Sequence, residues 1–220
     1  MKEKTKSAVK KPRVSKAARN EDERQQKLQA ILDAALEVFS AKGFAATRLE
    51  DVAKKAGVAK GTVYLYVSSK HELFEAMIRN SFVPTFDMLE VATAVDGLTL
   101  EQLITILIEW FQVEVLKTKR REMLWLILRE AKQFPELAHA HHQLIVSRAL
   151  GILRKRSEAA LASGEISHDE VVRFPHLAIA PAIVAIIWTE LFNDIEPLDV
   201  AGMMQAYRDL LLRSLKGNTP

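Results

Sequence analysis

The sequence predicts an all-α protein. Apolar residues recur at helical spacing along nearly the whole chain of 220 residues, and no segment of convincing length alternates between apolar and polar residues as a half-buried strand would. Capping boxes, in which Ser or Thr is followed three positions later by Glu or Gln, mark helix starts. They occur at Thr47/Glu50, Ser69/Glu72, Thr99/Gln102 and Ser167/Glu170. Each box opens an apolar periodic segment, so both signals support the same division into helices.

The predicted helices follow from these starts and from the breakers between them. A first helix is expected over about 22–41, and Gly43 should supply the positive φ that ends it. Two short helices should follow over about 48–56 and 60–67. A fourth should open at Lys70 and be kinked or ended by Pro84. Later helices are predicted near 100–117, 120–133, 135–163, 168–193 and 199–215.

Charge is distributed unevenly along the chain. Residues 1–20 carry eight Lys or Arg and one acid, a net charge of +7, whereas the whole chain carries +3, so the other 200 residues carry −4. We expect this basic tail to be disordered, which suits an arm that contacts nucleic-acid phosphates. It equally suits a solvated leader that aids solubility, and the tail alone does not favour either interpretation.

The composition excludes several classes of protein. The chain has no cysteine, which removes disulfides and thiolate metal sites and is compatible with a reducing cytoplasm, where we expect the protein to act. No apolar segment of a secretion signal follows Met1. The longest apolar run, 177–188, has 12 residues and contains Pro181, whereas a bilayer span needs about 20 residues. We therefore expect no membrane partner and interpret this run as a buried or interface helix.

The central functional signal lies in residues 49–68. Ala53, Gly57 and Val63 have the spacing Ala-x3-Gly-x5-Val. A helix-turn-helix needs a small residue where its helices nearly touch, a glycine where the turn takes a positive φ, and an aliphatic residue that packs one helix on the other. The spacing meets all three requirements, although a generic helical hairpin would also allow it.

The second helix of this unit carries side chains suited to DNA. Short polar residues at a helix N-terminus match a recognition helix, whose N-terminal end enters the major groove. Lys offers a charge to phosphate, Thr and Tyr hydroxyls can bond phosphates or base edges, and glycine permits close approach of the backbone. The residues concerned are Lys60, Gly61, Thr62, Tyr64 and Tyr66, with Lys70 at the start of the next helix. The alternative for the two tyrosines is a place in the core.

The segment GFAATRLEDVAKKAGVAKGTVYLYVSSKHELFEAMI resembles the DNA-binding domain of the tetracycline-repressor (TetR/AcrR) family, over about residues 22–78. The resemblance implies that Thr47 and Arg48 touch the DNA backbone. It implies that Lys60, Gly61, Thr62 and Tyr64 meet base edges and phosphates, and that Tyr66 and Lys70 clamp phosphates. Two positions depart from the family pattern. Val67 stands where an aromatic residue is common, and Leu65 stands where some members have a second tyrosine, so one DNA contact is expected to be missing.

The remainder of the chain predicts a ligand cavity. An E-A-x-x-F-P-E-L element within residues 126–137 resembles a sub-group of the same family. The helix at 100–117 is apolar on most of its surface, which is typical of a central, buried helix. Aromatic and methionine side chains give soft, adaptable linings that suit apolar ligands. We expect such a cavity to be lined by Phe82, Phe86, Trp110, Phe111, Glu114, Met123 and Trp125. Plain core packing is the alternative for each of them.

The last two long helices are expected to form a homodimer. Small residues at spacings of four, three and four would let two helices approach closely. The predicted interface residues are Ala178, Ala182, Ala185, Thr189, Met203 and Tyr207. Pro175 and Pro181 speak against one unbroken helix here.

Catalytic and metal chemistry are not indicated. Of His139, His141 and His142, only the first and last would share a helix face, and no carboxylate repeats that spacing with them. The sequence shows no nucleophile–base pair and no phosphate-binding glycine loop. We therefore expect no cofactor, no metal and no enzymatic activity.

The sequence thus predicts three parts. They are a basic tail over 1–20, a three-helix helix-turn-helix DNA-binding domain over 21–79, and a helical ligand-binding and dimerisation domain over 80–217. The fourth helix should join the second part to the third. The predicted function is that of a homodimeric regulator, a repressor released from a palindromic double-stranded operator by a small apolar or amphipathic effector. The alternative is a DNA-binding architectural protein of the same fold that works through protein partners.

Overall fold

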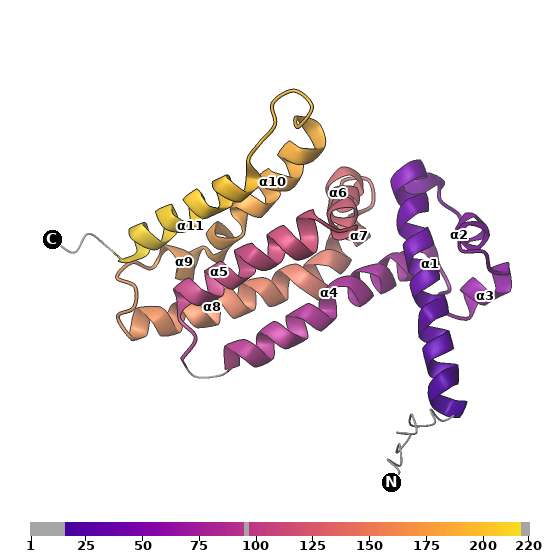
Figure 1. Cartoon of the computed structure of the whole chain (residues 1–220), viewed down its shortest axis with the longest axis horizontal. Coiled ribbons are helices and arrows are strands. Elements are labelled where there is room, and N and C mark those ends of the chain that lie inside the picture. Colours follow the sequence, from indigo (N-terminus) through magenta and orange to yellow (C-terminus); the bar gives the residue numbers. More distant parts are fainter. Residues whose placement is uncertain (1–15, 95–96, 217–220) are drawn as a thin grey trace, which may run out of the picture.

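The computed structural model describes residues 16–94 and 97–216, and every regular element in these residues is helical (Figure 1). The all-α prediction is therefore confirmed. The basic tail lies largely outside the described residues, but its last five residues, 16–20, are helical rather than part of an unstructured arm.

The N-terminal helices form one group. They are α1 (Lys16–Ala46), α2 (Leu49–Lys55) and α3 (Lys60–Tyr64), and α4 (Lys70–Ala94) leads away from them (Figure 1). The first helix begins six residues before the predicted start. It is interrupted near its end by Gly43, whose φ of 77° lies in the left-handed region that glycine adopts without a steric penalty. Ile31, Phe39 and Val63 are completely buried where these helices meet.

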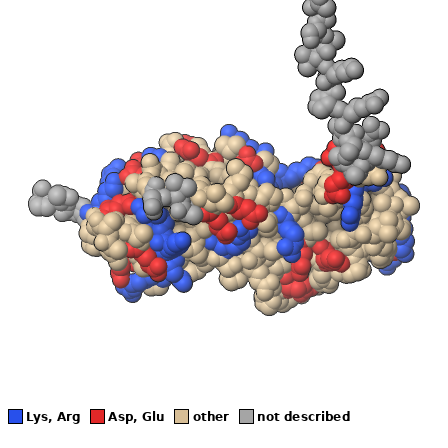
Figure 2. Space-filling view, turned by 90° about the horizontal axis from the view of Figure 1, so that it is seen from below, with Lys and Arg blue, Asp and Glu red and all other residues tan. Residues whose placement is uncertain are grey.

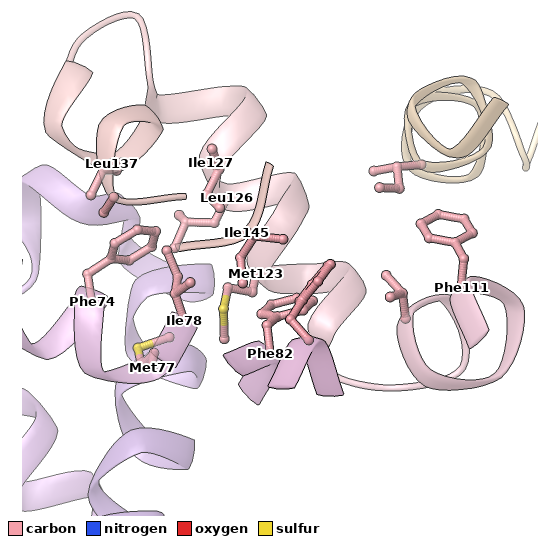
Figure 3. Packing of buried hydrophobic residues seen from close by; sticks show 14 of the residues in the cluster. Phe74, Met77, Ile78, Phe82, Phe111, Met123, Leu126, Ile127, Leu137 and Ile145 are labelled. Carbon is pink, nitrogen blue, oxygen red and sulfur yellow. The ribbon is translucent and has the colours of Figure 1, made fainter. Parts of the chain in front are cut away.

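The long helix α4 connects this group to the rest of the molecule. It continues through Pro84, so the prediction that this proline ends the helix is wrong. Pro84 is exposed. Figure 3 shows how Phe74, Ile78 and Phe82 of α4 face Met123 and other apolar side chains of α6 (Arg120–Glu130). One apolar core therefore runs from the DNA-side helices into the body.

The body contains the remaining helices. The predicted helix at 100–117 is α5 (Leu100–Trp110), followed by the π-helix η1 (Phe111–Leu116). The predicted helix at 135–163 consists of α7 (Pro135–His141), the π-helix η2 (His142–Val146) and α8 (Ser147–Ala162). The prediction that the first of these is buried all round is only partly right, since Ile106 and Val113 are 40% and 53% exposed.

The prediction of one helix over 168–193 is wrong. The structure has three pieces there: α9 (Glu170–Arg173), the 3₁₀ helix η3 (Pro175–Ala178) and α10 (Ala180–Leu191). Pro175 and Pro181 each lie in the first turn of a piece, where proline's missing N–H leaves no helical bond unmade. The last helix of the described residues is α11 (Val200–Lys216), which contacts α10 and α5.

The predicted capping boxes have different outcomes. At Thr99/Gln102 both reciprocal bonds are present, at 3.1 and 2.8 Å, and Ser69 Oγ accepts from the Glu72 backbone at 3.1 Å. The other two predictions are wrong. Arg48 rather than Thr47 caps α2, and Ser167 donates to the Lys216 carbonyl at 2.8 Å instead of capping α9. None of the helices in the described residues is long and apolar enough to cross a membrane.

Candidate nucleic-acid interface

The turn between α2 and α3 has the geometry that its spacing predicts. Ala53 and Val63 are 3% and 0% exposed, so the small residue and the aliphatic residue both lie in the contact between the two helices. Gly57 has a φ of 69° with open space around it, which shows that conformation, and not crowding, requires glycine here. The Val58 N–H donates to the Ala53 carbonyl at 3.0 Å and closes the turn.

The start of α3 is open to solvent. Lys60, Gly61 and Tyr64 are exposed and Thr62 is half-buried. A side chain at Gly61 would meet nothing within 4 Å, so the absence of one leaves the helix backbone free for close approach by a partner. These are the first turns of a helix held on its inner side by Val63, which is the arrangement a recognition helix requires.

Lys60 is held in place by neighbours on both helices. Its Nζ lies 2.5 Å from the Glu50 carboxylate of α2 and 5.7 Å from the centroid of the Tyr64 ring. The hydrogen bond from Lys60 lowers the pKa of Glu50, and the same bond raises the pKa of Lys60. Both groups are solvent-exposed, so a phosphate can compete with Glu50 for the ammonium.

The two residues predicted to touch the DNA backbone before α2 differ in exposure. Arg48 is exposed at the helix start. Thr47 is only 2% exposed, and its hydroxyl donates to the Gly43 carbonyl at 2.8 Å. The Thr47 side chain therefore fastens the end of α1, and Arg48 is the member of the pair whose side chain is exposed. The contact of these two residues with the DNA backbone stays a prediction.

Tyr66 and Lys70 have protein partners that the sequence did not reveal. The Tyr66 hydroxyl donates to the Arg24 carbonyl at 3.3 Å. The Lys70 ammonium donates to the carbonyls of Phe44 and Ala45, both at 2.9 Å, and so neutralises the C-terminal end of α1. Whether these groups also clamp phosphates stays a prediction.

Leu65 is a residue that the sequence reasoning undervalued. It is 80% exposed directly after α3, beside Tyr64, which is 45% exposed. An apolar side chain so fully in water between polar candidates is suited to contact with the methyl group of thymine. The departure from tyrosine at this position, expected from the sequence to remove a contact, instead leaves an exposed apolar side chain.

The face of the molecule drawn in Figure 2 is mixed in charge. Lys and Arg side chains lie among Asp and Glu over the face drawn in Figure 2, without one continuous basic area. Oppositely charged side chains of α1 and α2 are paired in Lys42–Asp51 at 3.0 Å and Lys55–Glu37 at 2.7 Å.

The predicted ligand residues only partly converge. Phe86, Trp110 and Phe111 line an apolar cavity of about 80 Å³ between α4, α5, η1, α8, η3, α10 and α11. Phe82 lies beside it, with its ring centroid 6.4 Å from that of Trp110.

The other three predicted ligand residues are corrected. Met123 lines a separate hollow of about 320 Å³ between α1, α4 and the start of α6, and Trp125 lines another of about 290 Å³. Glu114 binds the Arg120 guanidinium at 2.5 Å. None of the three reaches the apolar cavity, because α6 and the end of η1 diverge from it.

Two of the predicted dimer residues, Ala178 and Ala185, are buried in their own chain. The other four, Ala182, Thr189, Met203 and Tyr207, are half-buried; Ala182 lines the apolar cavity and the Tyr207 hydroxyl donates to the Leu177 carbonyl. Part of the small-residue stripe therefore packs within the chain, and a role of the half-buried residues in a dimer stays a prediction. Large apolar residues are exposed on η3, on α10, in the turn after α10 and on α11. They are Leu177, Ile183, Val184, Leu191, Phe192, Ile195 and Leu210, and we call them the α10–α11 face.

The histidines of the 139–142 segment do not form a metal site. Burial and the neighbouring His142 lower the pKa of His141 to about 4. No three His, Asp or Glu side chains in the described residues are grouped as a metal site would require.

Comparison with known proteins identifies the family of this helix-turn-helix. The model of the "Bacterial regulatory proteins, tetR family" matches residues 31–77, which extend from α1 into α4. Residues 31–77 therefore form a DNA-binding domain of the TetR family. This match, together with relatives that are named as transcription and metabolism regulators, makes the chain a DNA-binding transcription regulator rather than an enzyme.

Individual TetR-family relatives agree with this assignment. An uncharacterized HTH-type regulator of Bacillus subtilis, YvdT, is 45% identical over 64 residues, which is 29% of this chain and 33% of that protein. The fatty acid metabolism regulator protein of the same species is 25% identical over 189 residues, 86% of this chain and 95% of that one. The chain thus spans a third of the first relative and nearly all of the second.

A solved structure shares the fold of this chain. The regulator FadR from Bacillus subtilis, in complex with stearoyl-CoA, superposes with a TM-score of 0.66 at 21% identity. The match covers 85% of this chain and 98% of that one. The arrangement of the N-terminal helix-turn-helix and the helical body is therefore that of the family.

Proposed function

We propose that this protein is a homodimeric repressor of the TetR family, released from its operator by a small apolar or amphipathic effector. The observation that carries the proposal is the position of the apolar cavity. Phe86, which lines it, belongs to α4, the helix that starts at Lys70 beside the helix-turn-helix. One rigid element therefore has one end at the DNA-side unit and its far half at the cavity.

The DNA contacts follow from exposure. Lys60, Gly61 and Tyr64 are exposed on α3, and Arg48 is exposed at the start of α2. Together they supply charge, hydroxyl and backbone groups to DNA. Leu65 adds an apolar surface for a thymine methyl group. A two-fold dimer presents two such units, so the operator should be a near-palindrome.

The homodimer is proposed to form through the α10–α11 face. Seven large apolar side chains are exposed there, and Ile195 is 80% exposed. Exposed apolar side chains gathered on neighbouring elements mark an interaction site. A second copy of the chain would bury it symmetrically, in place of the predicted small-residue stripe.

The effector class is supported by the cavity lining and by a relative. The cavity walls are aromatic and aliphatic, which suits an apolar body. The fatty acid metabolism regulator covers most of this chain, and the related FadR structure holds stearoyl-CoA. Acyl chains are therefore reasonable first probes of this cavity.

The proposed division is a DNA-binding domain over 21–79 and a ligand-binding and dimerisation domain over 80–217. The boundary falls within α4, which is unbroken from Lys70 to Ala94, so the two domains would share this helix. The proposal implies action in the cytoplasm, because bacterial DNA lies there.

The test is selection of bound sequences from a random DNA pool, followed by screening of molecules for release. Stearate, stearoyl-CoA and small apolar molecules are the first probes. The proposal expects enriched near-palindromes and loss of DNA binding with at least one apolar probe. Enrichment without symmetry, together with DNA binding that no probe changes, would contradict it.

The second candidate is an architectural DNA-binding protein that uses its body for protein partners. The exposed α10–α11 face is the observation that favours it, because a different protein could cover those side chains instead of a second copy. A purified chain that stays monomeric, and whose DNA binding no probe weakens, would favour this candidate.

A further inference from the structure

One residue that lines the apolar cavity carries a buried hydrogen-bond donor without a partner. The lining is made by side chains such as Phe86, Phe111 and Met204, and by small residues including Ala149 and Ala182. Trp110 is the member of the lining whose side chain carries a strong hydrogen-bond donor, its indole N–H.

The Trp110 indole is fixed by aromatic neighbours. Its ring centroid lies 5.8 Å from that of Phe86 at an interplanar angle of 71°, and Phe82 lies on it in a similar edge arrangement. Such geometry is favourable between aromatic rings and leaves few orientations for the indole. The N–H therefore cannot turn freely to find a partner.

The Nε1 atom of Trp110 is buried and has no acceptor among the described residues. A buried donor without an acceptor destabilises a folded protein. Native structures rarely contain a buried donor that makes no hydrogen bond. An ordered water needs two to four polar partners, and the apolar lining supplies few besides this N–H. A molecule with an apolar body and one acceptor oxygen would satisfy the donor without bringing other polar groups into the cavity.

We propose that the Trp110 indole N–H is the polar recognition group of the effector cavity, and that it selects apolar molecules that carry a carbonyl or carboxyl oxygen. This inference rests on the proposed effector function and names the chemical class that the cavity accepts. The carbonyl oxygen accepts the hydrogen bond, and the hydrocarbon part lies among Phe86, Phe111 and Met204.

Occupation of the cavity requires one wall to move. Its volume of about 80 Å³ is smaller than the roughly 150 Å³ that accommodates benzene in an engineered protein cavity. One wall is the η3–α10 segment, which is not a continuous helix and changes from 3₁₀ to α geometry at Ile179. This break lets the segment shift outward, and the same segment carries Ile183 and Val184 of the α10–α11 face.

Two isosteric probes test the hydrogen bond. Acetophenone and isopropylbenzene have the same number of heavy atoms and differ by a carbonyl oxygen in place of a methyl group. Their binding to the full chain is measured by depletion of vapour above the protein solution, which needs no optical signal from the protein. The measurement is repeated with Trp110→Phe, which keeps an aromatic ring but has no N–H. Trp125→Phe is the matched control, because Trp125 lines a different hollow.

The expected result is a weakening of acetophenone binding by about five- to tenfold in Trp110→Phe, the usual effect of one hydrogen bond. Isopropylbenzene binding should change less than about twofold, and Trp125→Phe should leave both unchanged. If Trp110→Phe weakens the binding of both probes equally, or of neither, Trp110 is not the recognition group. The cavity would then still bind apolar effectors. If neither probe binds the natural chain, the proposal fails together with the cavity's role as an effector site.

A measurement on the natural chain keeps the test valid if Trp110→Phe does not fold. The chain has three tryptophans, so its nitrogen–proton spectrum contains three indole signals, and Trp125→Phe and Trp188→Phe assign the third by elimination. Acetophenone should move the Trp110 signal downfield, as a new hydrogen bond does, and isopropylbenzene should not. An equal shift with both probes would overturn the proposal.

Discussion

Lys70 at the start of α4 lies against Phe44 at the end of α1. Its ammonium is 2.9 Å from the Phe44 carbonyl oxygen and 4.7 Å from the centroid of the Phe44 ring. The Phe44 ring in turn lies 5.0 Å from that of Phe134, which precedes α7 in the body. A residue predicted only to clamp phosphate therefore also joins the DNA-side helices to the body.

This relationship changes what substitution of Lys70 should do. Lys70→Ala is expected to lower the free energy of unfolding by about 1–3 kcal/mol, because two charge-assisted hydrogen bonds to α1 are lost. Urea unfolding measures this change. Lys132→Ala, at an exposed lysine after α6, is the control and should change stability by less than about 0.5 kcal/mol.

The phosphate role of Lys70 is tested separately by salt dependence. If Lys70 also contacts phosphate, Lys70→Ala should reduce the magnitude of the slope of log K against log[salt] by about 1 and weaken all sequences equally. An unchanged slope in a folded variant would show that Lys70 acts on the α1–α4 junction alone.

Leu65 is predicted to read a thymine methyl group. Replacing individual thymines of a selected operator by deoxyuridine removes one methyl group at a time. At one position per half-site the natural chain should lose affinity about threefold to fivefold, since a buried methyl contributes about 0.8 kcal/mol. Leu65→Ala should bind the two DNAs equally. A uracil effect that persists in Leu65→Ala would assign the methyl contact to another residue.

The α10–α11 face is predicted to hold the dimer together. Val184→Glu places a charge among apolar side chains that a second copy would bury, so the variant should be monomeric by light scattering at concentrations where the natural chain is a dimer. Leu161→Glu, at a 37% exposed leucine of α8, should leave the mass unchanged. If both variants dimerise with the same affinity as the natural chain, the α10–α11 face is not the dimer interface.

His141 should make stability depend on pH. Burial lowers its pKa from 6.5 to about 4, so the unfolded chain binds a proton that the folded chain does not between these values. The free energy of unfolding should therefore be highest above pH 6.5. It should fall by about 1–3 kcal/mol as the pH falls toward 4, because the buried imidazole must then be protonated on unfolding. Urea unfolding at pH 7.5 and 5 measures the loss, and His141→Asn should reduce it while His139→Asn should not. An identical pH response in all three chains would contradict this assignment.

The sequence predicted the helix-turn-helix well because its demands are local. Gly57 must take a positive φ and Val63 must be buried, and both requirements can be seen in the spacing of a single turn. The same holds for the reciprocal cap at Thr99, whose partner is three residues away.

The body was predicted less well because its interactions are not local. Ala182 belongs to a stripe of small residues that suits a dimer, but whether it faces a second chain or its own core depends on how α10 packs. Lys70 bonds to carbonyls about 25 residues earlier in the chain, and no periodic pattern indicates such a contact. Pro175 and Pro181 did signal that the helix at 168–193 is broken, and the structure puts them at the starts of η3 and α10.

The central claim is that the effector cavity and the DNA-contacting unit are coupled through α4. Its most direct test is calorimetric titration of a molecule that releases the protein from DNA, with and without the selected operator. A tenfold loss of DNA affinity on effector binding corresponds to about 1.4 kcal/mol of coupling, and linkage requires operator DNA to weaken effector binding by the same factor. The account predicts equal reciprocal factors in the two experiments. Effector affinities that are identical with and without operator would contradict it.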